Sequence, residues 1–301
     1  MLKVIVTTGA RLHFGLLAHA PNAPRRFGGV GLMVEQPGFQ VSATRLPSSA
    51  NTDCAAVDEY VGPTAWMPRV MDIARRCREV DLRQDNPGQA GVSWQLDSVI
   101  PAHVGLGSGT QLGLAVAQAW VAIQNILHSN APGLDSTSLA RLAGRGLRSA
   151  LGIHGFHNGG LLVEAGKRSS DQISPVVARV DFPADWRIVL ISPPNERGLS
   201  GTAEIAAFAS LQPMSDAVSA ALCRTVLLEL LPAVHEADFD ACSEALFQFG
   251  WLIGEYFAPA QGGVFASPRM ATLVDWLRQR GIAGVGQSSW GPLLFALCPD
   301  E

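Results

Sequence analysis

Alternating apolar and polar positions predict β-strands through the first half of the chain. In one segment near the N-terminus the apolar positions are Leu12, Phe14 and Leu16, and Arg11 and His13 stand between them. Successive side chains of a strand point to opposite faces, so Arg11 and His13 should project together, toward solvent or toward a ligand. Further strands are expected at 3–8, 27–31, 39–44, 92–96 and 161–166.

Apolar positions at helical spacing predict the main helices. Thr64 is expected to cap a helix whose apolar face runs from Trp66 to Cys77. The stretch from Ser108 to Leu127 is apolar nearly all round, which predicts a helix at the centre of a domain. Residues 47–62 lack periodicity and are expected to form a loop. Helices dominate the second half, at about 200–210, 215–231, 237–256 and 267–280.

The mixture of strands and late helices indicates an α+β fold in two domains. The segment 181–185 is interpreted as the joint, which gives an N-terminal domain of 1–184 and a C-terminal domain of 185–301. The second domain opens with a strand at 186–191 that is expected to be buried. Short strands at 282–285 and 292–297 close the chain around a second glycine-rich turn.

A glycine-rich turn precedes the central apolar helix. Gly105, Gly107 and Gly109 alternate with larger residues, and Ser108 and Thr110 stand among them. Glycine allows positive φ and close approach of the backbone to a ligand, and a helix start presents unpaired N–H groups. Such a turn is a ready anion site, and phosphate is the usual anion. A tight strand-to-helix turn without a ligand is the alternative.

Arginines follow the central helix at helical spacing. Ser136 or Ser138 is expected to cap a helix that carries Arg141, Arg145 and Arg148, whose spacings of four and three place them on one stripe. This stripe contains no acidic residue, so it faces either solvent or an anion.

The segment from Gly152 to Gly160 is rich in glycine and is expected to be a turn that feeds a strand and a hairpin. His154 and His157 within it would need a third ligand to hold a metal ion, and no such ligand is evident nearby. Contact with a polar ligand or a structural hydrogen bond is the other interpretation of these histidines.

Composition excludes several classes of protein. The 301 residues are 48% hydrophobic and 16% charged with a net charge of −4, so neither nucleic acid nor an anionic membrane is an expected partner. Of 22 basic residues only Lys3 and Lys167 are lysines, and arginine suits bidentate contacts with phosphate or carboxylate. The five scattered cysteines favour a reducing cytoplasm. No signal sequence or unbroken membrane-length apolar run is evident.

The glycine-rich turn resembles the P-x-x-x-G-L-G-S-S-A phosphate loop of the GHMP kinase superfamily. Pro101, Gly105, Leu106, Gly107 and Ser108 are in register with that motif. The chain departs from it at the next two positions, where a glycine and a threonine replace serine and alanine. The resemblance implies an N-terminal domain like domain 2 of ribosomal protein S5 and a ferredoxin-like C-terminal domain.

Within this superfamily the chain resembles the β-ribofuranosylaminobenzene 5'-phosphate synthases of methanopterin biosynthesis. The stretches that carry the likeness cover nearly the whole chain: 11–17, 28–31, 101–119, 144–152, 156–164, 197–201, 204, 261–263 and 286–291. The family implies condensation of phosphoribosyl pyrophosphate with 4-aminobenzoate or 4-hydroxybenzoate, with loss of CO2 and pyrophosphate. No residue distinguishes the two acceptors.

The family reaction suggests roles for the polar and aromatic residues of these stretches. The phosphates or carboxylate would be bound by Arg11, Gly105, Gly107, Ser108, Gly109, Thr110, Arg145, Arg148, Arg197, Gln287, Ser288 and Ser289. Candidates for proton handling or carboxylate positioning are His13, His154, His157 and Glu204, and Phe14 and Trp290 are candidate walls of an aromatic pocket. Mg²⁺ and a homodimer are expected, whereas pyridoxal phosphate, NAD and haem are not.

Two other functions compete with this one. An ATP-dependent small-molecule kinase is the main alternative, because many members of the superfamily are kinases. Kinases of this superfamily often place an aspartate before the glycine hairpin, and residues 141–158 contain no Asp or Glu. A non-catalytic phosphate-sensing module is the third possibility.

Overall fold

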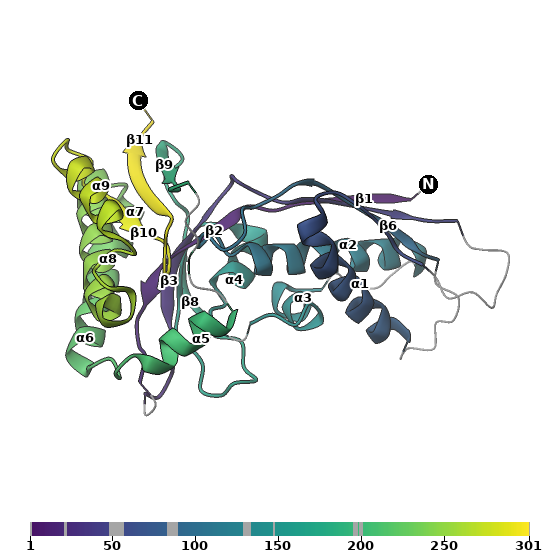
Figure 1. Ribbon diagram of the computed structural model, residues 1–301, viewed down its shortest axis with the longest axis horizontal. Helices are drawn as coiled ribbons and strands as arrows, with labels where there is room; N and C mark the ends of the chain where they lie inside the picture. The colour runs from purple at the N-terminus through teal and green to yellow at the C-terminus, as the bar shows by residue number, and fades with distance from the viewer. Residues whose placement is uncertain are drawn as a thin grey trace.

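The computed structural model describes residues 2–20, 23–47, 57–82, 90–128, 134–146, 148–194, 198 and 201–300, without the side chains of 81–82, 127–128 and 201–205. It has the expected α+β architecture. Figure 1 shows α1–α4 beside the N-terminal strands and α6–α9 gathered at the opposite end of the molecule, with β2 and β3 between them.

The first sheet has the strand order β1-β4-β6-β5. Its strands are β1 (Lys3–Thr7), β4 (Gln40–Arg45), β6 (Val92–Ser98) and β5 (Glu59–Val61). The expectation of a loop throughout 47–62 was wrong at β5, which pairs with β6 in parallel. Three residues are too few to show a period, so only the neighbouring strand defines this one.

The second sheet has the order β2-β3-β7-β8, with all pairs antiparallel. It contains β2 (Ala10–Leu16), β3 (Gly29–Val34), β7 (Leu161–Glu164) and β8 (Val176–Val180). Both faces of β2 are covered, and His13 on its polar face is 7% exposed. The alternation predicted this strand correctly, and its polar face is not a solvated one.

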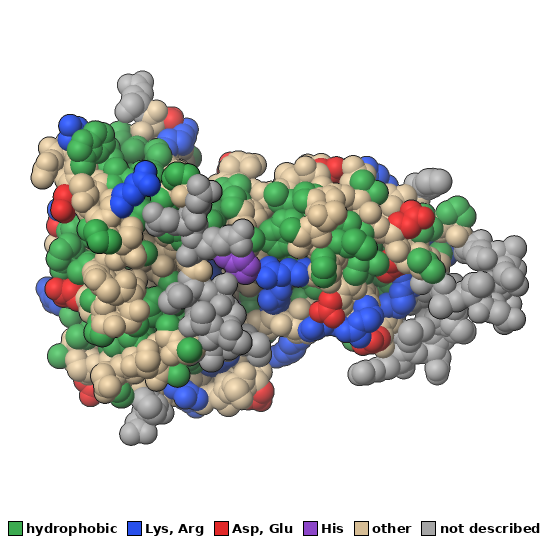
Figure 2. Space-filling model, in the orientation of Figure 1, with side chains coloured by type: hydrophobic (Ala, Val, Ile, Leu, Met, Phe, Trp, Pro, Cys, Tyr) green, Lys and Arg blue, Asp and Glu red, His purple; other side chains and the backbone are tan. Residues whose placement is uncertain are grey.

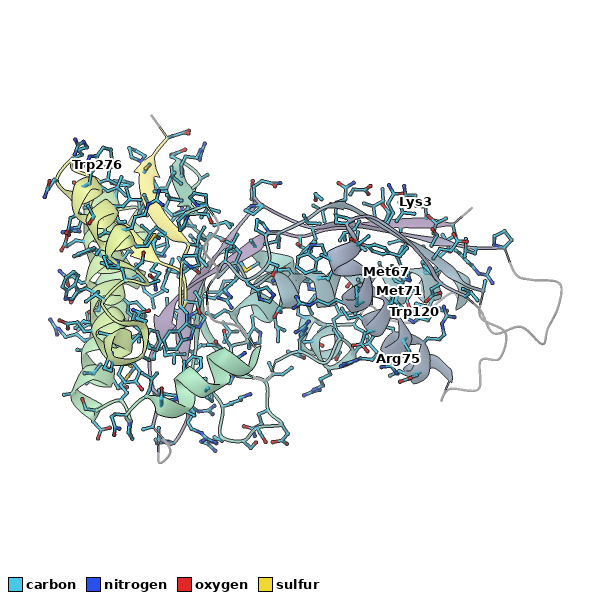
Figure 3. All side chains as sticks on the ribbon, viewed as in Figure 1. Lys3, Met67, Met71, Arg75, Trp120 and Trp276 are labelled. Atoms are coloured by element: carbon cyan, nitrogen blue, oxygen red, sulfur yellow. The ribbon has the colours of Figure 1, made fainter. Side chains whose placement is uncertain are left out.

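The helices of the N-terminal half differ from expectation mainly at their ends. They are η1 (Thr64–Trp66), α1 (Met67–Leu82), α2 (Ser108–His128), α3 (Ser136–Leu142) and α4 (Leu151–Asn158). Pro63, not Thr64, precedes the first turn, and Thr64 lies inside it. The cap of α3 is Asp135, whose carboxylate accepts a hydrogen bond from the N–H of Ser138 at 2.7 Å. Met67, Met71 and Arg75 lie along α1 (Figure 3).

Helix α4 replaces the turn that the glycines of 152–160 predicted. These glycines lie where the helix packs closely against its neighbours. A Cβ on Gly155 would stand 2.3 Å from Met33 Cγ, and one on Gly152 would stand 3.0 Å from Gln111 Nε2. Glycine is present here because the packing requires it, and a single sequence does not distinguish that role from a turn.

The C-terminal half is a three-stranded sheet of order β10-β11-β9 with a layer of helices. Its elements are β9 (Trp186–Ile191), α5 (Gly201–Ser210), α6 (Asp216–Thr225), the π-helix η2 (Val226–Leu230), α7 (Leu231–Glu236), α8 (Phe239–Gln261), α9 (Pro268–Arg278), β10 (Val285–Gln287) and β11 (Leu294–Pro299). The expectation that β9 is buried was wrong, because it is an edge strand and Val189 is 46% exposed. Trp276 on α9 is also half-exposed (Figure 3).

One helical run is long and apolar enough to cross a membrane by length and composition alone. It comprises α6, η2 and α7 and extends from Asp216 to Glu236, with a mean hydropathy of 1.7. Leu222, Val226 and Leu230 on it are buried in the core, whereas Leu227 is 62% exposed. A helix of a globular core has the same character, so the run is weak evidence for a membrane span.

The hydrophobic core is continuous between the two halves. Phe14 on β2 packs against Phe295 on β11, with ring centroids 5.0 Å apart. The boundary at 184/185 falls in the connection between β8 and β9 and stays a prediction. The halves share one core, so they should not be treated as independent bodies.

Ser288 joins three segments that are far apart in the sequence. Its side chain is fully buried, and its hydroxyl accepts a hydrogen bond from the N–H of His13 at 3.0 Å. The same hydroxyl donates to the carbonyl oxygen of Gly105 at 2.8 Å. The C-terminal glycine-rich turn therefore holds both β2 and the N-terminal glycine loop in place.

Replacing Ser288 should weaken this junction measurably. Ser288→Ala leaves a buried N–H and a buried carbonyl without a partner, so we expect the free energy of unfolding to fall by about 1–3 kcal/mol. Chemical denaturation of the variant measures this change, with Ser210→Ala as a control at an exposed helix end. Equal midpoints for the two variants would contradict a clamping role.

Candidate functional site

A cavity of about 620 Å³ lies where the glycine loop, β2, the connection from α3 to α4, and helices α5 and α8 meet. Basic side chains gather beside a histidine on this part of the surface (Figure 2). The residues that line it are Arg11, His13, Leu16, Phe27, Arg69, His103, Gly105, Leu106, Gly107, Ser108, Gly109, Thr110, Gly144, Arg145, Gly146, Arg148, Ser149, Phe208, Phe257 and Ser289.

The glycine loop forms one wall of this cavity. Gly105 and Gly107 have φ values of 95° and 67°, in the left-handed region that favours glycine. A Cβ on Gly107 would stand 3.3 Å from Nε of Arg11. The carbonyl of Gly107 accepts the N–H groups of Thr110 and Gln111 at 3.0 and 3.2 Å, which begins α2. A helix start aims its remaining N–H groups and the positive end of its dipole at the cavity.

Four arginines line the cavity, and the helical stripe predicted for Arg141, Arg145 and Arg148 does not form. Helix α3 ends at Leu142, and Gly144 and Gly146 follow with φ values of 66° and 96°. The chain therefore changes direction, so Arg141 stays exposed on α3 while Arg145 and Arg148 line the cavity. Arg11 and Arg69 complete the set, and sequence reasoning missed Arg69.

The electrostatic character of the cavity is strongly positive. Among its described lining residues there is no Asp or Glu. Burial, followed by the charges of Arg69 and Arg76, lowers the pKa of Arg145. Nε of Arg145 is buried and has no hydrogen-bond partner among the described residues. An anion in the cavity would relieve both the repulsion and the unpaired donor.

One of the three predicted histidines lies in the cavity. Burial, followed by the charge of Arg11, holds the pKa of His13 well below its ordinary value, so this imidazole is neutral at neutral pH. His154 donates from Nε2 to the carbonyl of Ser174 at 2.7 Å, and Nδ1 of His157 lies 2.8 Å from the hydroxyl of Ser136. These contacts support a structural role for both histidines.

His103 is a lining residue that sequence reasoning missed. It has a φ of 61°, an uncommon conformation for a residue other than glycine. Its carbonyl accepts a hydrogen bond from the N–H of Gly198 at 2.9 Å. Neither periodicity nor spacing signals such a position.

Aromatic side chains form the other wall of the cavity. Phe27, Phe208 and Phe257 line it. Trp290 lies behind them, stacked on Phe257 with ring centroids 4.3 Å apart and 5.2 Å from Phe208. Trp290 thus supports the wall without lining it, whereas Phe14 belongs to the core against β11. The wall residues on α5 and α8 carried no sequence signal that separates them from ordinary core residues.

The remaining predicted site residues have different positions. Ser289 lines the cavity, and its N–H donates to the carbonyl of His13 at 2.8 Å. Gln287 shapes the same turn, since its side-chain oxygen accepts the N–H of Ala266 at 2.7 Å. Arg197 lies outside the described residues, and Glu204 is on α5 with a side chain that is not described.

The described residues do not form a Mg²⁺ site by themselves. They contain no group of three His, Cys, Asp or Glu side chains that could hold a metal ion. The side-chain oxygen donors among the described lining residues are the hydroxyls of Ser108, Thr110, Ser149 and Ser289. Mg²⁺ prefers carboxylates and phosphate oxygens, and the described part of this cavity supplies no carboxylate.

Comparison with known proteins agrees with this fold. Residues 230–301 match the family model described as GHMP kinases C terminal. The structure is similar to mevalonate pyrophosphate decarboxylase from Streptococcus pyogenes, with a TM-score of 0.64, 14% identity and coverage of 99% of this chain and 90% of that one. It is also similar to homoserine kinase from Cytophaga hutchinsonii, with a TM-score of 0.60, 17% identity and coverage of 99% and 86%.

Sequence relatives are more specific. A β-ribofuranosylphenol 5'-phosphate synthase from Methanothermobacter thermautotrophicus is 27% identical over 100% of this chain and 90% of its own length. One from Archaeoglobus fulgidus is 30% identical over 79% of this chain and 72% of its own length. The chain is therefore a member of the GHMP kinase superfamily and belongs to the β-ribofuranosylphenol 5'-phosphate synthase family.

Proposed function

We propose that this protein transfers the 5-phosphoribosyl group of phosphoribosyl pyrophosphate to the ring of a para-substituted benzoate, with release of CO2 and pyrophosphate. The observation that carries the proposal is one cavity that is lined by four arginines, a glycine loop and an aromatic wall. The basic and the aromatic lining residues suit the two substrates, an anionic donor and a flat aromatic acceptor.

The reaction makes one carbon–carbon bond and breaks two bonds. Pyrophosphate leaves C1 of the ribosyl group with the electrons of the C–O bond, and an oxocarbenium-like centre develops there. The ring carbon that bears the carboxylate, para to the hydroxyl or amino group, attacks this centre. The bond to the carboxyl group then breaks, its electron pair restores the aromatic ring, and CO2 departs.

Residues of this chain can act at each step of this reaction. The N–H groups of the glycine loop, with Arg11 and Arg145 beside them, would stabilise the negative charge of departing pyrophosphate. The wall of Phe208 and Phe257 would orient the ring and exclude water from the reactive centre. Neutral His13 would accept a proton from the acceptor's para substituent as positive charge develops on the ring, and would return it once loss of CO2 has restored the aromatic ring.

The name of the relatives favours 4-hydroxybenzoate as the first acceptor to test. A ribofuranosylphenol phosphate results when the acceptor carries a para hydroxyl group, whereas 4-aminobenzoate gives the aminobenzene product. Both reactions use the same donor and the same cavity. Either product would place the protein in methanopterin biosynthesis.

Mg²⁺ is proposed to enter with the donor, bound to its pyrophosphate, as part of the substrate. This assignment fits a cavity whose described lining residues supply guanidinium groups, N–H groups and hydroxyls. A homodimer in the cytoplasm remains the expected state of the protein.

Phosphoryl transfer from ATP is the competing activity, and the site favours it less. A kinase that uses a base needs a carboxylate at the cavity, and none is present among the described lining residues. Glu164 is a fully buried acid that does not line the cavity, and its carboxylate accepts a hydrogen bond from the N–H of Ala150 at 2.8 Å.

The reaction itself is the first test. Purified protein with Mg²⁺, phosphoribosyl pyrophosphate and 4-hydroxybenzoate should release CO2 and pyrophosphate in equal amounts without consuming ATP. Carboxyl-labelled acceptor measures the CO2, and parallel reactions with 4-aminobenzoate compare the two acceptors. Phosphorylation of a small alcohol by ATP, with no product from either benzoate, would overturn the proposal in favour of a kinase.

Gly107→Val should weaken donor binding strongly in a folded protein. The new side chain would occupy the wall of the cavity next to Arg11, at a φ that β-branched residues rarely adopt. We expect the affinity for phosphoribosyl pyrophosphate to fall by at least tenfold, about 1.4 kcal/mol, in a calorimetric titration. Gly281→Val is the matched control, because Gly281 has a φ of 86° and open space around it. Equal donor affinity in both variants would contradict a phosphate-binding loop.

His13→Gln should reduce the pH dependence of stability. The folded protein holds the pKa of His13 below 6.5, so below that pH the unfolded chain binds a proton that the folded chain does not. The free energy of unfolding of the wild type should therefore fall as the pH drops from 6.5, by at most about 1.4 kcal/mol per pH unit from this group. Denaturation at several pH values between 5 and 7.5 measures both proteins, and parallel curves would show that His13 is not held neutral.

A further inference from the structure

We infer that the cavity is divided into two subsites, and that Arg148 binds the carboxylate of the aromatic acceptor while Arg11 and Arg145 bind the phosphates of the donor. This division rests on the proposed function and extends it, since neither the spacing of the arginines nor the family resemblance says which arginine meets which group.

The side chains of Arg11 and Arg145 lie next to the glycine loop. A Cβ on Gly107 would stand 3.3 Å from Nε of Arg11, and one on Gly109 would stand 3.5 Å from both terminal nitrogens of Arg145. Both guanidinium groups therefore lie against the backbone at the start of α2. A phosphate bound by the loop would lie within reach of both, with bidentate geometry available.

The side chain of Arg148 lies next to the aromatic wall. Its guanidinium carbon lies 5.9 Å from the centre of the Phe208 ring. Lys167 fixes the turn that precedes it, because Nζ donates to the carbonyl of Gly146 at 3.2 Å. Arg148 thus lies at the seam between the aromatic and the basic parts of the cavity.

Contacts of His19 and Tyr256 hold the aromatic wall in place. Nδ1 of His19 lies 2.7 Å from the hydroxyl of Tyr256, which donates to the carbonyl of Gln212 at 2.8 Å. The His19 ring also contacts Phe27 and Phe208, with centroids 5.7 and 5.6 Å away. These contacts leave the wall little freedom, so a flat ring can bind against it without a large cost in side-chain entropy.

A ring against this wall with its carboxylate toward Arg148 has a productive orientation. The guanidinium group of Arg148 can pair with the carboxylate while the guanidinium group itself stays over the ring of Phe208. The carboxylate-bearing carbon would then point toward the loop, where the donor's C1 must lie. The subsite would select a benzoate over an uncharged ring because only the benzoate makes the ion pair.

Steady-state kinetics of arginine variants test the division. Arg148→Gln should raise the KM for 4-hydroxybenzoate by at least tenfold and change the KM for phosphoribosyl pyrophosphate by less than threefold. Arg145→Gln should do the reverse. Arg141→Gln is the matched control, because Arg141 is exposed on α3 and does not line the cavity.

Inhibition by phenol supplies a second measurement, since phenol has the ring without the carboxylate. Its inhibition constant should be unchanged in Arg148→Gln and raised in Phe208→Leu, and Arg148→Lys should recover part of the affinity for the benzoate. A donor KM raised as much as the acceptor KM in Arg148→Gln, or neither raised, would overturn the division. If the wild type uses neither benzoate, the proposed function itself fails. An active wild type with an unaffected Arg148→Gln removes only the assignment of Arg148.

Discussion

Burial of guanidinium groups beside one another is the constraint on which the site depends. Burial, followed by the charges of Arg69 and Arg76, lowers the pKa of Arg145. Burial, followed by the charge of Arg11, lowers the pKa of His13 and keeps that imidazole neutral. Concentrated charge of one sign destabilises the folded chain, and a bound anion would offset that cost. The described lining residues offer no carboxylate to neutralise it, which suits the cavity to an anionic substrate.

The cavity exists only where the two halves of the chain meet. The N-terminal half supplies the glycine loop and the arginines, and the C-terminal half supplies Phe208, Phe257 and Ser289. Ser288 fixes the relation between them through its bonds to His13 and Gly105. A buried hydroxyl with two backbone partners resists displacement, because moving it would leave polar groups unpaired. The glycine loop and the aromatic wall are therefore held at a set separation, as a reaction between two bound substrates requires.

The same fold supports different chemistry when the residues around the phosphate loop change. The structures of a decarboxylase and a homoserine kinase share this architecture at 14% and 17% identity, which shows the fold and not the reaction. In this chain arginines lie in the turn beside the glycine loop, and aromatic side chains line the space next to them. These features favour a flat acid as the second substrate over an alcohol that needs deprotonation.

Local sequence patterns determined much of this protein. Alternation predicted β2, the apolar run predicted α2, and the glycine spacing predicted a turn at a helix start, because each depends on residues adjacent in the chain. Only the tertiary structure decided which faces of these elements meet. Gly155 was interpreted as part of a turn but allows Met33 to approach α4. The arginines share the cavity because Gly144 and Gly146 redirect the chain, and Phe257 reaches it from a helix more than a hundred residues away. Such contacts depend on packing between residues far apart in the sequence, and the local periodicity of apolar residues does not predict them.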